Sequence, residues 1–470
     1  MPAGWLNGEI AVIGLARSGR AVATLLARTG ANVYASDSGT GKALDAAAAA
    51  LREEEVETQL GAHDLERIAR ASLLVVSPGV PPEAPPLAAA RARGIEIVSE
   101  VEIALRLLPN LRYIAITGTN GKTTTTALTA HVLSALGHRA VAAGNIGLPL
   151  AEIALRTTPP DWVALEISSF QLHDTPSIDP RVGVLTNLSA NHLDRYASME
   201  EYYGDKALLF RNATAASHWV TNGDDVVVEA LAEAAAGIHC RFSVRGRSDA
   251  WVDRSKGMLE ILGEPLLART DLQLIGDHNV ANALAAGLAV VLASETHRTP
   301  EALGAIARGL RSFQGLEHRI ETVTEANGVL WINDSKSTNV ASTEVALRGM
   351  TRPTVLLLGG RHKGEPYTAL EKEIRRTVKV VIAYGEAAPI VEGDLGSVVP
   401  VERLGSSFHD VISAARRTAT AGDVVLLSPA CSSYDMFENY EQRGREFKRL
   451  VSQSSTIRKH SPTGKRETQQ

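Results

Sequence analysis

Short runs of β-branched and aliphatic residues alternate with alanine- and leucine-rich stretches along almost the whole chain. The runs read EIAVIG, ANVYAS, LLVVSPG, YIAITG, WVALEIS, VGVLTN, TVLLLGG, KVVIAYG and DVVLLSPA. Strands separated by helical stretches pair in parallel and are covered on both faces, so the pattern predicts α/β domains built on parallel sheets. Gly, Ser, Asn or Asp residues close the runs. This places them at the carboxyl ends of strands, where open α/β sheets bind ligands.

The length of 470 residues exceeds what one hydrophobic core usually organises and predicts about three domains. Pro109 and Asn110 separate a helical stretch from a new strand and mark the first boundary, and a second boundary falls near Gly315. We therefore expect domains over residues 1–109, 110–314 and 315–455, and a polar, disordered tail over 456–470.

The charge and aromatic content argue against nucleic acid as a partner. The formal net charge is -5 and 4% of residues are aromatic, so the chain offers neither a basic field nor a stacking surface. Cys240 and Cys431 are too few for a disulfide framework or a zinc cage. The N-terminus lacks a signal-peptide pattern, and apolar stretches such as 283–293 are too short to span a bilayer. We expect a cytoplasmic monomer without membrane insertion.

The strongest local motif is YIAITGTNGKTTTTALTAHVLSALG, in which a strand leads into a glycine-rich turn and then a helix that begins at Lys122 or Thr123. Such a turn points backbone N–H groups at a phosphate, Lys122 adds a cation, and Thr123 or Thr124 can offer a hydroxyl to Mg²⁺. Ile116 replaces the first glycine of the common pattern. The alternative is an ordinary glycine-rich turn. The predicted ATP loop comprises Gly118, Thr119, Asn120, Gly121, Lys122, Thr123 and Thr124.

The string TGTNGKTT resembles the ATP loop of the Mur ligases and of their relative folylpolyglutamate synthase. Three further motifs follow in the family's order: WVALEISSFQL, VGVLTNLSANHLDRY and EEYYGDKALLF. The resemblance implies that Glu166 and His192 bind Mg²⁺ and that Lys206 reacts with CO₂ to give a carbamate. A solvated glutamate, a packing or capping histidine and a solvated helix lysine are the alternatives. By resemblance the metal ligands are Thr123, Glu166, His192 and Lys206, and the catalytic residues are Lys122, His192 and Lys206.

Two motifs resemble the parts of the family that contact the rest of ATP. GDHNVANALAA carries Asn279 and Asn282, which by resemblance meet the adenine, although an asparagine at a helix start is ordinarily a cap. EHRIE and WINDSKSTN carry Arg319 and Asp334, which by resemblance reach the phosphates and ribose from the third domain. An arginine supplied by another domain would let domain closure control the chemistry.

The third domain resembles the D-glutamate-adding members of the family through NDSKSTN, LLLGGRHKG and LSPACSSYDMFENYEQRG. The resemblance implies that Thr338 and Lys363 face the side-chain carboxylate of D-glutamate. Ser433 and the backbone near Tyr440 would face its α-carboxylate, although the family often has Phe at the last position. Cys431 could be proposed as a nucleophile, but a reaction in which ATP activates the carboxylate needs no acyl-enzyme.

The N-terminal segment EIAVIGLARSGRAVATLLARTGANVYASD is similar to a dinucleotide-binding unit, with Gly14, Gly19 and Asp37 in place. Ala16 stands where a middle glycine would let the backbone approach a pyrophosphate, which disfavours NAD. In the Mur family the resemblance implies a site for the UDP end of the substrate instead. By resemblance Arg17 and Ser18 lie beside the diphosphate or uracil, Asp37 lies beside the uracil, and Gly79 lies on the opposite wall. Asn145 of GNIG, in the central domain, should meet the sugar or peptide portion of the same substrate.

The family resemblance that these motifs carry implies an ATP- and Mg²⁺-dependent amide ligase of peptidoglycan precursor synthesis, with D-glutamate and UDP-N-acetylmuramoyl-L-alanine as substrates and an acyl phosphate as intermediate. We expect a Rossmann-like first domain for the UDP substrate, a central P-loop-type ATPase domain and a Rossmann-like third domain for the amino acid. Another Mur-type or folylpolyglutamate synthase-like ligase is the nearest alternative. A nucleotide-binding regulatory protein or a dehydrogenase would use residues 14–37 and would leave Glu166, His192 and Lys206 without a reason to coexist.

Overall fold

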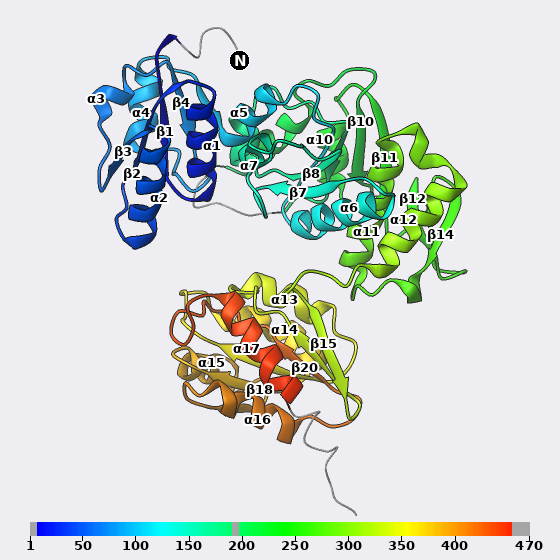
Figure 1. Cartoon of the computed structure of the whole chain (residues 1–470). Helices are drawn as coiled ribbons and strands as arrows, with labels where there is room; N and C mark the ends of the chain where they lie inside the picture. The colour runs from blue at the N-terminus through cyan, green and yellow to red at the C-terminus, as the bar shows by residue number, and fades with distance from the viewer. Residues whose placement is uncertain (1–6, 190–195, 197, 454–470) are drawn as a thin grey trace, which may run out of the picture. The chain divides into compact units, whose positions relative to one another are not determined.

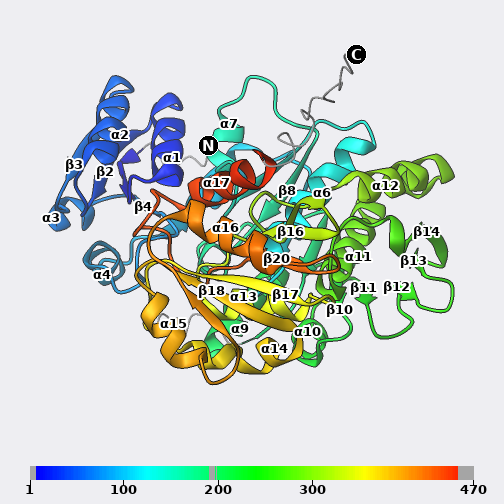
Figure 2. The same cartoon turned by 90° about the horizontal axis from the view of Figure 1, so that it is seen from below.

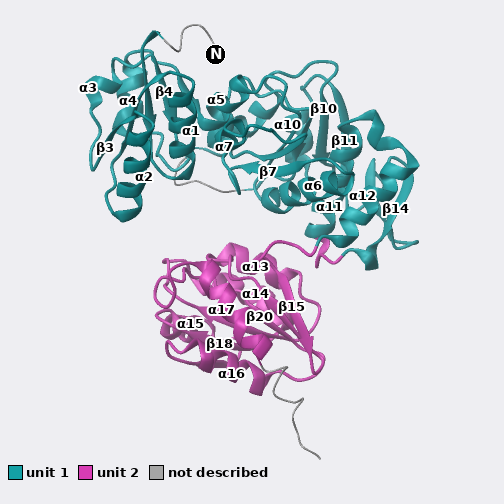
Figure 3. Cartoon of the chain, viewed as in Figure 1, with its two compact units in different colours: residues 1–272, 278–313 teal, residues 273–277, 314–470 magenta. Residues whose placement is uncertain are grey.

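A computed structural model of the chain describes residues 7–189, 196 and 198–453 (Figure 1). The chain divides into two compact units, one formed by residues 1–272 with 278–313 and the other by residues 273–277 with 314–470 (Figure 3). The first unit holds a 5-stranded and a 9-stranded sheet, and the second holds a 6-stranded sheet. The predicted α/β class with parallel sheets is therefore confirmed.

The N-terminal sheet has the order β3-β2-β1-β4-β5 and is parallel throughout. Its strands are β1 Glu9–Ile13, β2 Asn32–Asp37, β3 Glu57–Leu60, β4 Leu73–Val76 and β5 Ile97–Ser99. Its helices are α1 Arg17–Arg28, α2 Lys42–Glu53, α3 Leu65–Ile68, α4 Pro85–Ala92 and α5 Glu100–Leu107. The strand order reverses between β1 and β4, so the loops after these two strands lie at the topological switch point, where such sheets bind ligands. A Cβ on Gly19 would come within 1.7 Å of the Gly14 carbonyl oxygen, so only glycine lets α1 pack this closely.

The central sheet has the order β14-β13-β12-β11-β10-β9-β6-β8-β7. Its strands are β6 Tyr113–Thr117, β7 Ala140–Gly144, β8 Trp162–Glu166, β9 Val182–Leu185, β10 His218–Asn222, β11 Ile238–Ser243, β12 Ala250–Asp253, β13 Met258–Ile261 and β14 Glu264–Ala268. Strands β6 to β12 pair in parallel, and β13 and β14 complete the sheet as an antiparallel edge. The associated helices are α6 Lys122–Ala135, α7 Leu150–Ala154, α8 Ser169–His173, α9 Met199–Ala207, α10 Val226–Ala232, α11 Asp277–Leu292 and α12 Pro300–Ser312, with short 3-10 turns at Leu208–Phe210, Arg269–Asp271 and Glu295–Arg298.

Helix α5 ties the first two sheets into one unit. Ile103 belongs to the core of the N-terminal sheet, whereas Val101 and Ala104 on the same helix belong to the core of the central sheet. Helix α7 packs against both α5 and α1, and its Ala151 enters the N-terminal core. The buried face of one short helix is thus shared between two hydrophobic cores.

The second unit is a sheet of order β15-β16-β20-β17-β18-β19, with β15 antiparallel to its neighbour and the other pairs parallel. Its strands are β15 Glu321–Ala326, β16 Val329–Asn333, β17 Thr354–Gly359, β18 Val378–Tyr384, β19 Val401–Arg403 and β20 Val424–Leu427. Its helices are α13 Val340–Arg348, α14 Glu371–Thr377, α15 Ala388–Leu395, α16 Phe408–Thr418 and α17 Tyr440–Gln453, with a 3-10 turn at Tyr367–Leu370. Helices α16 and α17 cover one face, and α13, α14 and α15 cover the other (Figure 2).

The segment 273–277 lies inside the expected central domain but groups with the second unit, because Ile275 packs against the core of that unit. The domain boundaries at 109 and 314 and the disordered tail stay predictions. No helix among the described residues is long and apolar enough to cross a membrane.

Candidate active site

The phosphate loop joins β6 to α6, as the sequence predicts. Gly118 and Gly121 have φ values of 140° and 82°, which side-chain-bearing residues rarely adopt. The Lys122 Nζ atom folds back over the loop and donates to the carbonyl oxygens of Gly118 at 2.9 Å and Thr119 at 2.8 Å. Thr123 is half-buried and Thr124 is buried in the first turn of α6. The loop therefore has the backbone form of an anion cradle, with an ammonium group held against it.

The segment after β9 braces this loop from one side. Asn187 accepts a hydrogen bond from the Thr119 N–H through its carbonyl at 2.8 Å and from the Asn120 N–H through its side chain at 2.9 Å. The Thr186 hydroxyl donates to the Asn120 carbonyl at 2.7 Å. A Cβ on Gly118 would come within 2.1 Å of the Thr186 Oγ1 atom. The loop conformation is thus fixed before any phosphate binds.

Glu166 ends β8, next to β6 in the sheet, and its side chain is buried. Its Oε1 atom accepts a hydrogen bond of 2.8 Å from the Asn145 side-chain amide. Its Oε2 atom is buried and has no hydrogen-bond partner among the described residues. A buried carboxylate oxygen left without a donor is costly unless a cation is bound. Mg²⁺ is held by one or two carboxylates together with phosphate oxygens and water, so Glu166 fits a magnesium site.

Lys206 lies on α9 and is 1% exposed, which excludes the solvated helix lysine that was its alternative. Its Nζ atom donates to the Thr117 hydroxyl at 3.1 Å, at the end of β6. Burial, and after it the charge of Lys122, hold the pKa of Lys206 well below its ordinary value, while Glu166 acts in the opposite direction. Only the neutral amine can react with CO₂, and a lowered pKa increases the fraction of Lys206 in that form.

His192, the other predicted metal ligand, lies outside the described residues. Among the residues that are described, His, Cys, Asp and Glu side chains form no group of three that could hold a metal ion. The site seen here is thus a single buried carboxylate beside a phosphate loop.

Of the two asparagines predicted to meet adenine, Asn282 contacts the phosphate loop and its helix, and Asn279 contacts Asn282. The Asn282 Oδ1 atom accepts a hydrogen bond of 3.2 Å from Thr125, and its Nδ2 atom donates to Asn279 at 3.1 Å. A Cβ on Gly121 would come within 2.4 Å of Asn282 Oδ1. Helix α11 begins at Asp277, so Asn279 lies in its first turn. Asn282 therefore supports the phosphate loop, and the contact of both asparagines with adenine stays a prediction.

In the N-terminal domain, Asp37 closes the ends of the first two strands. Its carboxylate accepts hydrogen bonds of 2.8 Å from the N–H groups of Leu15 and Gly39. Ser18 is half-buried in the first turn of α1, and Gly79 is exposed after β4. The Arg17 guanidinium donates to Glu152 at 2.9 and 3.2 Å and to the Gly147 carbonyl at 2.8 Å. The role of these residues toward UDP stays a prediction.

A cavity of about 690 Å³ lies in the first unit between the segment after β4 and helices α8 and α9. Gln171 lines it, and its buried Nε2 atom has no hydrogen-bond partner among the described residues. None of the five predicted UDP-binding residues lines this cavity. Ser77, Pro78 and Val80, which flank Gly79 in the segment after β4, do line it, so the cavity borders one of the two strand-end loops predicted to hold UDP.

In the second unit, Arg319 lies between two residues in the left-handed region, His318 with φ 64° and Ile320 with φ 46°. This conformation is strained for a β-branched residue. Two hydrogen bonds stabilise this strained conformation. The Ile320 N–H donates to Asp334 at 3.1 Å, and the His318 carbonyl accepts from the Lys336 N–H at 3.0 Å. Burial raises the pKa of Asp334 to about 6. Arg319 therefore lies in a strained turn that Asp334 stabilises through the N–H of the next residue, Ile320.

The structure brings together the two residues predicted to face the side-chain carboxylate of D-glutamate. The exposed Lys363 donates from Nζ to the Thr338 hydroxyl at 3.3 Å. Ser433 is buried, and the Tyr440 carbonyl accepts from Ser335 at 2.8 Å. Cys431 is a buried free thiol whose pKa burial raises to about 11, which agrees with discounting it as a nucleophile.

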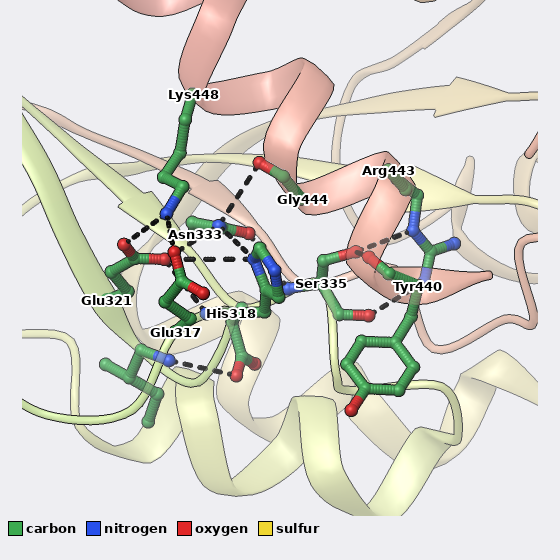
Figure 4. Close-up of polar contacts among 11 residues, drawn as sticks. Glu317, His318, Glu321, Asn333, Ser335, Tyr440, Arg443, Gly444 and Lys448 are labelled. Carbon is green, nitrogen blue, oxygen red and sulfur yellow. Dashed lines mark hydrogen bonds and ion pairs between the residues drawn. The ribbon is translucent and has the colours of Figure 1, made fainter.

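Arg443 is a residue that the sequence analysis missed. It is fully buried, and it donates from Nε to the Ser335 hydroxyl at 2.9 Å and from Nη2 to the Ser335 carbonyl at 2.8 Å (Figure 4). It also donates to the Cys431 carbonyl at 3.2 Å. Arg443 therefore joins the loop after β16 to the loop after β20, the two loops that carry the predicted Thr338 and Ser433. The sequence did carry one signal of this burial: Arg443 precedes the apolar Phe447 by one helical turn, which places both residues on the buried face of α17.

Three family models match the chain: "Mur ligase MurD-like, N-terminal domain" over residues 8–99, "Mur ligase middle domain" over 116–290 and "Mur ligase, glutamate ligase domain" over 318–431. The UDP-N-acetylmuramoylalanine--D-glutamate ligase of Salinibacter ruber is 42% identical, covering 94% of this chain and 96% of its own. The enzyme of the same name from Geotalea uraniireducens is 40% identical, covering 95% and 97%. The structure of UDP-N-acetylmuramate-alanine ligase from Thermotoga maritima has the same fold, with a TM-score of 0.58 at 20% identity, covering 96% of this chain and all of that one.

Proposed function

The chain belongs to the Mur ligase family, and from this membership we propose that it is an ATP-dependent amide ligase that joins D-glutamate to UDP-N-acetylmuramoyl-L-alanine. The identity of the substrates is supported by the names of relatives that match along nearly the whole chain. The chemistry is supported by one observation above all: three features lie on adjacent elements of the first unit. They are the phosphate loop, the Glu166 oxygen that has no hydrogen-bond partner among the described residues, and the buried Lys206 amine.

The reaction couples two transfers. The terminal carboxylate of the UDP substrate attacks the γ-phosphorus of ATP, the bond to the bridging oxygen breaks, and ADP leaves. The resulting acyl phosphate is attacked at its carbonyl carbon by the deprotonated amine of D-glutamate. The tetrahedral intermediate then loses a proton from its nitrogen and expels phosphate, which leaves the amide. Each step moves negative charge, so positioning and electrostatic stabilisation carry most of the catalysis.

In this proposal Lys122 and the loop N–H groups hold the β and γ phosphates, with Gly118 and Gly121 supplying the turn. Glu166, the Thr123 hydroxyl and His192 would hold Mg²⁺, which when bound neutralises charge on the phosphates. Lys206 would act as a carbamate: its neutral amine attacks CO₂, a proton is released, and the side chain becomes an oxygen ligand. The depressed pKa of Lys206 supports this.

The second unit would supply the amino-acid site. Thr338 and Lys363 offer a hydroxyl and an ammonium group within 3.3 Å of each other, which suits the distal carboxylate of D-glutamate. Ser433 and the backbone near Tyr440 would take the α-carboxylate, on loops that Arg443 holds together. Arg319 and Asp334 would serve the ATP phosphates and ribose.

In the first domain we propose that the loops after β1 and β4, with Arg17, Ser18, Asp37 and Gly79, hold the UDP moiety. Asn145 would meet the sugar or peptide portion. The monomeric state and the cytoplasmic location stay predictions. The location is supported by the use of ATP and by two buried free cysteines.

The experiment that tests this function is phosphate release from Mg-ATP with UDP-N-acetylmuramoyl-L-alanine and a panel of amino acids. We expect release with D-glutamate and not with L-glutamate, L-alanine or a diamino acid. Release with a pteroate substrate and L-glutamate would instead favour a folylpolyglutamate synthase-like ligase.

A further inference from the structure

The contacts of Arg17 point away from a role limited to binding a diphosphate. Arg17 is the first residue of α1, in the N-terminal domain, and its guanidinium reaches α7 of the central domain. Both oxygens of Glu152 accept from it, at 2.9 and 3.2 Å, and the Gly147 carbonyl accepts from Nη1 at 2.8 Å. Helices α1 and α7 pack against each other (Figure 1). A planar guanidinium that donates to a carboxylate and a carbonyl at the same time fixes the orientation of these two groups as well as the distance between them.

The loop held by Arg17 leads directly to the buried metal carboxylate. This loop joins β7 to α7 and is closed by a hydrogen bond of 2.8 Å from the Gly144 N–H to the Leu148 carbonyl. At one end Asn145 donates to Glu166 twice, from its backbone N–H to the Glu166 carbonyl at 2.9 Å and from its side chain to Oε1 at 2.8 Å. Gly147, two residues on, is the point that Arg17 grips.

The start of the helix that carries Glu152 is itself held in place. Helix α7 begins beside the buried Glu100, whose side chain accepts a hydrogen bond from the Ala151 N–H. Burial raises the pKa of Glu100 to about 7, and the neighbouring charge of Glu152 adds to this. Glu152 therefore lies on a fixed helix start, so its hydrogen bonds with Arg17 fix the position of the Arg17 guanidinium.

We propose that Arg17 is a positioning residue for the magnesium site, acting through Gly147 and Asn145 to orient Glu166 so that its unpartnered Oε2 atom faces the cation. The inference rests on the proposed function, because it takes Glu166 to be a metal ligand. It deepens that function by making the N-terminal domain part of the metal site. Orienting contacts of this kind are typically worth about tenfold to a hundredfold in metal affinity.

The affinity for a divalent metal ion distinguishes a residue that positions the metal site from one that binds the diphosphate of the UDP substrate. In the full-length enzyme with a non-hydrolysable ATP analogue, Mn²⁺ binding is measured by electron paramagnetic resonance. We expect Asn145→Ala to weaken Mn²⁺ binding by about tenfold or more, and Arg17→Ala and Glu152→Gln by about threefold to tenfold, because they act one step further away. Arg17→Lys keeps the positive charge but not the fork, so it should also weaken Mn²⁺ binding.

Arg139→Ala is the matched control. It removes another exposed arginine–carboxylate pair, with Asp161, at the opposite end of β7. Wild-type Mn²⁺ affinity is expected there. If Arg17→Ala and Glu152→Gln keep wild-type Mn²⁺ affinity while Arg17→Ala raises only the KM of the UDP substrate, Arg17 is a diphosphate ligand and the proposal is overturned. If Glu166→Gln also keeps wild-type Mn²⁺ affinity, Glu166 is not a metal ligand, and the role proposed for Arg17 is wrong as well. D-glutamate-dependent phosphate release tests the proposed reaction separately.

Discussion

The Lys206 Nζ atom lies 3.1 Å from the Thr117 hydroxyl, at the end of the strand that carries the phosphate loop. A lysine buried there beside Lys122 holds its proton weakly. This relationship connects an apparently ordinary helix lysine with the phosphate chemistry and gives the first prediction.

Lys206→Ala should be nearly inactive, because the carbamate oxygens are lost. A small free carboxylate such as formate or acetate should restore part of the activity by occupying the vacated position. In the wild type, ¹³C NMR with ¹³CO₂ should detect a carbamate signal that is absent from the variant. Normal turnover of Lys206→Ala, or a wild-type enzyme indifferent to the removal of bicarbonate, would contradict the carbamate.

Lys122→Ala should lower turnover by about two orders of magnitude or more, because a preorganised cation at the transferring phosphate is usually worth that much. The melting temperature should change little, since the hydrogen bonds that Asn187 accepts from the loop and Thr186 donates to it still hold its conformation. Steady-state kinetics and differential scanning calorimetry check both statements. A variant that retains more than about a tenth of wild-type turnover would show that the loop does not bind the reacting phosphates.

Lys363→Ala should raise the KM for D-glutamate by about tenfold to a hundredfold and leave the KM for ATP nearly unchanged. The reason is the loss of a charge-assisted hydrogen bond worth about 1.5 to 3 kcal/mol. Lys372→Ala, which removes an exposed lysine on α14 of the same unit, is the control. Equal KM values for D-glutamate in the two variants would move the amino-acid site away from Lys363.

The pair His138 and His297 predicts a pH dependence of stability. Their Nε2 atoms lie 3.0 Å apart, and the His297 Nδ1 atom donates to the Val290 carbonyl at 2.7 Å. Two protonated rings would bring N–H groups face to face. Burial lowers the pKa of both residues, and Arg112 lowers them further. The unfolded chain then binds more protons, so the pair stabilises the fold above about pH 6.5 and this contribution is lost as the pH falls through the lowered values.

Chemical denaturation at pH 8 and pH 5.5 measures this effect. Buried carboxyls such as Glu100 and Asp334, whose pKa values are raised, act in the opposite direction. The informative quantity is therefore the difference between the wild type and His138→Gln. The free energy of unfolding should fall less on acidification in the variant, and an identical fall in both proteins would rule out the pair as the titrating group.

The elements that could be predicted from the sequence are those whose information is local. A strand, two glycines with positive φ and a helix lie within 25 residues of one another, so the phosphate loop and its lysine were predictable. The burial of Lys206 was not, because an amphipathic helix with lysines looks the same whether the lysine faces water or a neighbouring strand. Only the family resemblance favoured a lysine that faces the site over one that faces water.

The contacts that brace the site join residues far apart in the chain. Arg17 and Gly147 are 130 residues apart, and Arg443 and Ser335 are 108 apart. No spacing rule connects such pairs, since their meeting depends on how α1 packs on α7 and how α17 packs on its sheet. For the same reason Asn145 was assigned to the substrate alone, and its hydrogen bond with Glu166 was not expected.

The most direct test of the proposed chemistry uses UDP-N-acetylmuramoyl-L-alanine labelled with ¹⁸O in its terminal carboxylate. If the carboxylate attacks ATP to form an acyl phosphate, one labelled oxygen should leave with each phosphate released, and the amide product should form with D-glutamate. Mass spectrometry of the phosphate and of the product measures both at once. Unlabelled phosphate, or product formed equally well with another amino acid, would contradict the proposed function.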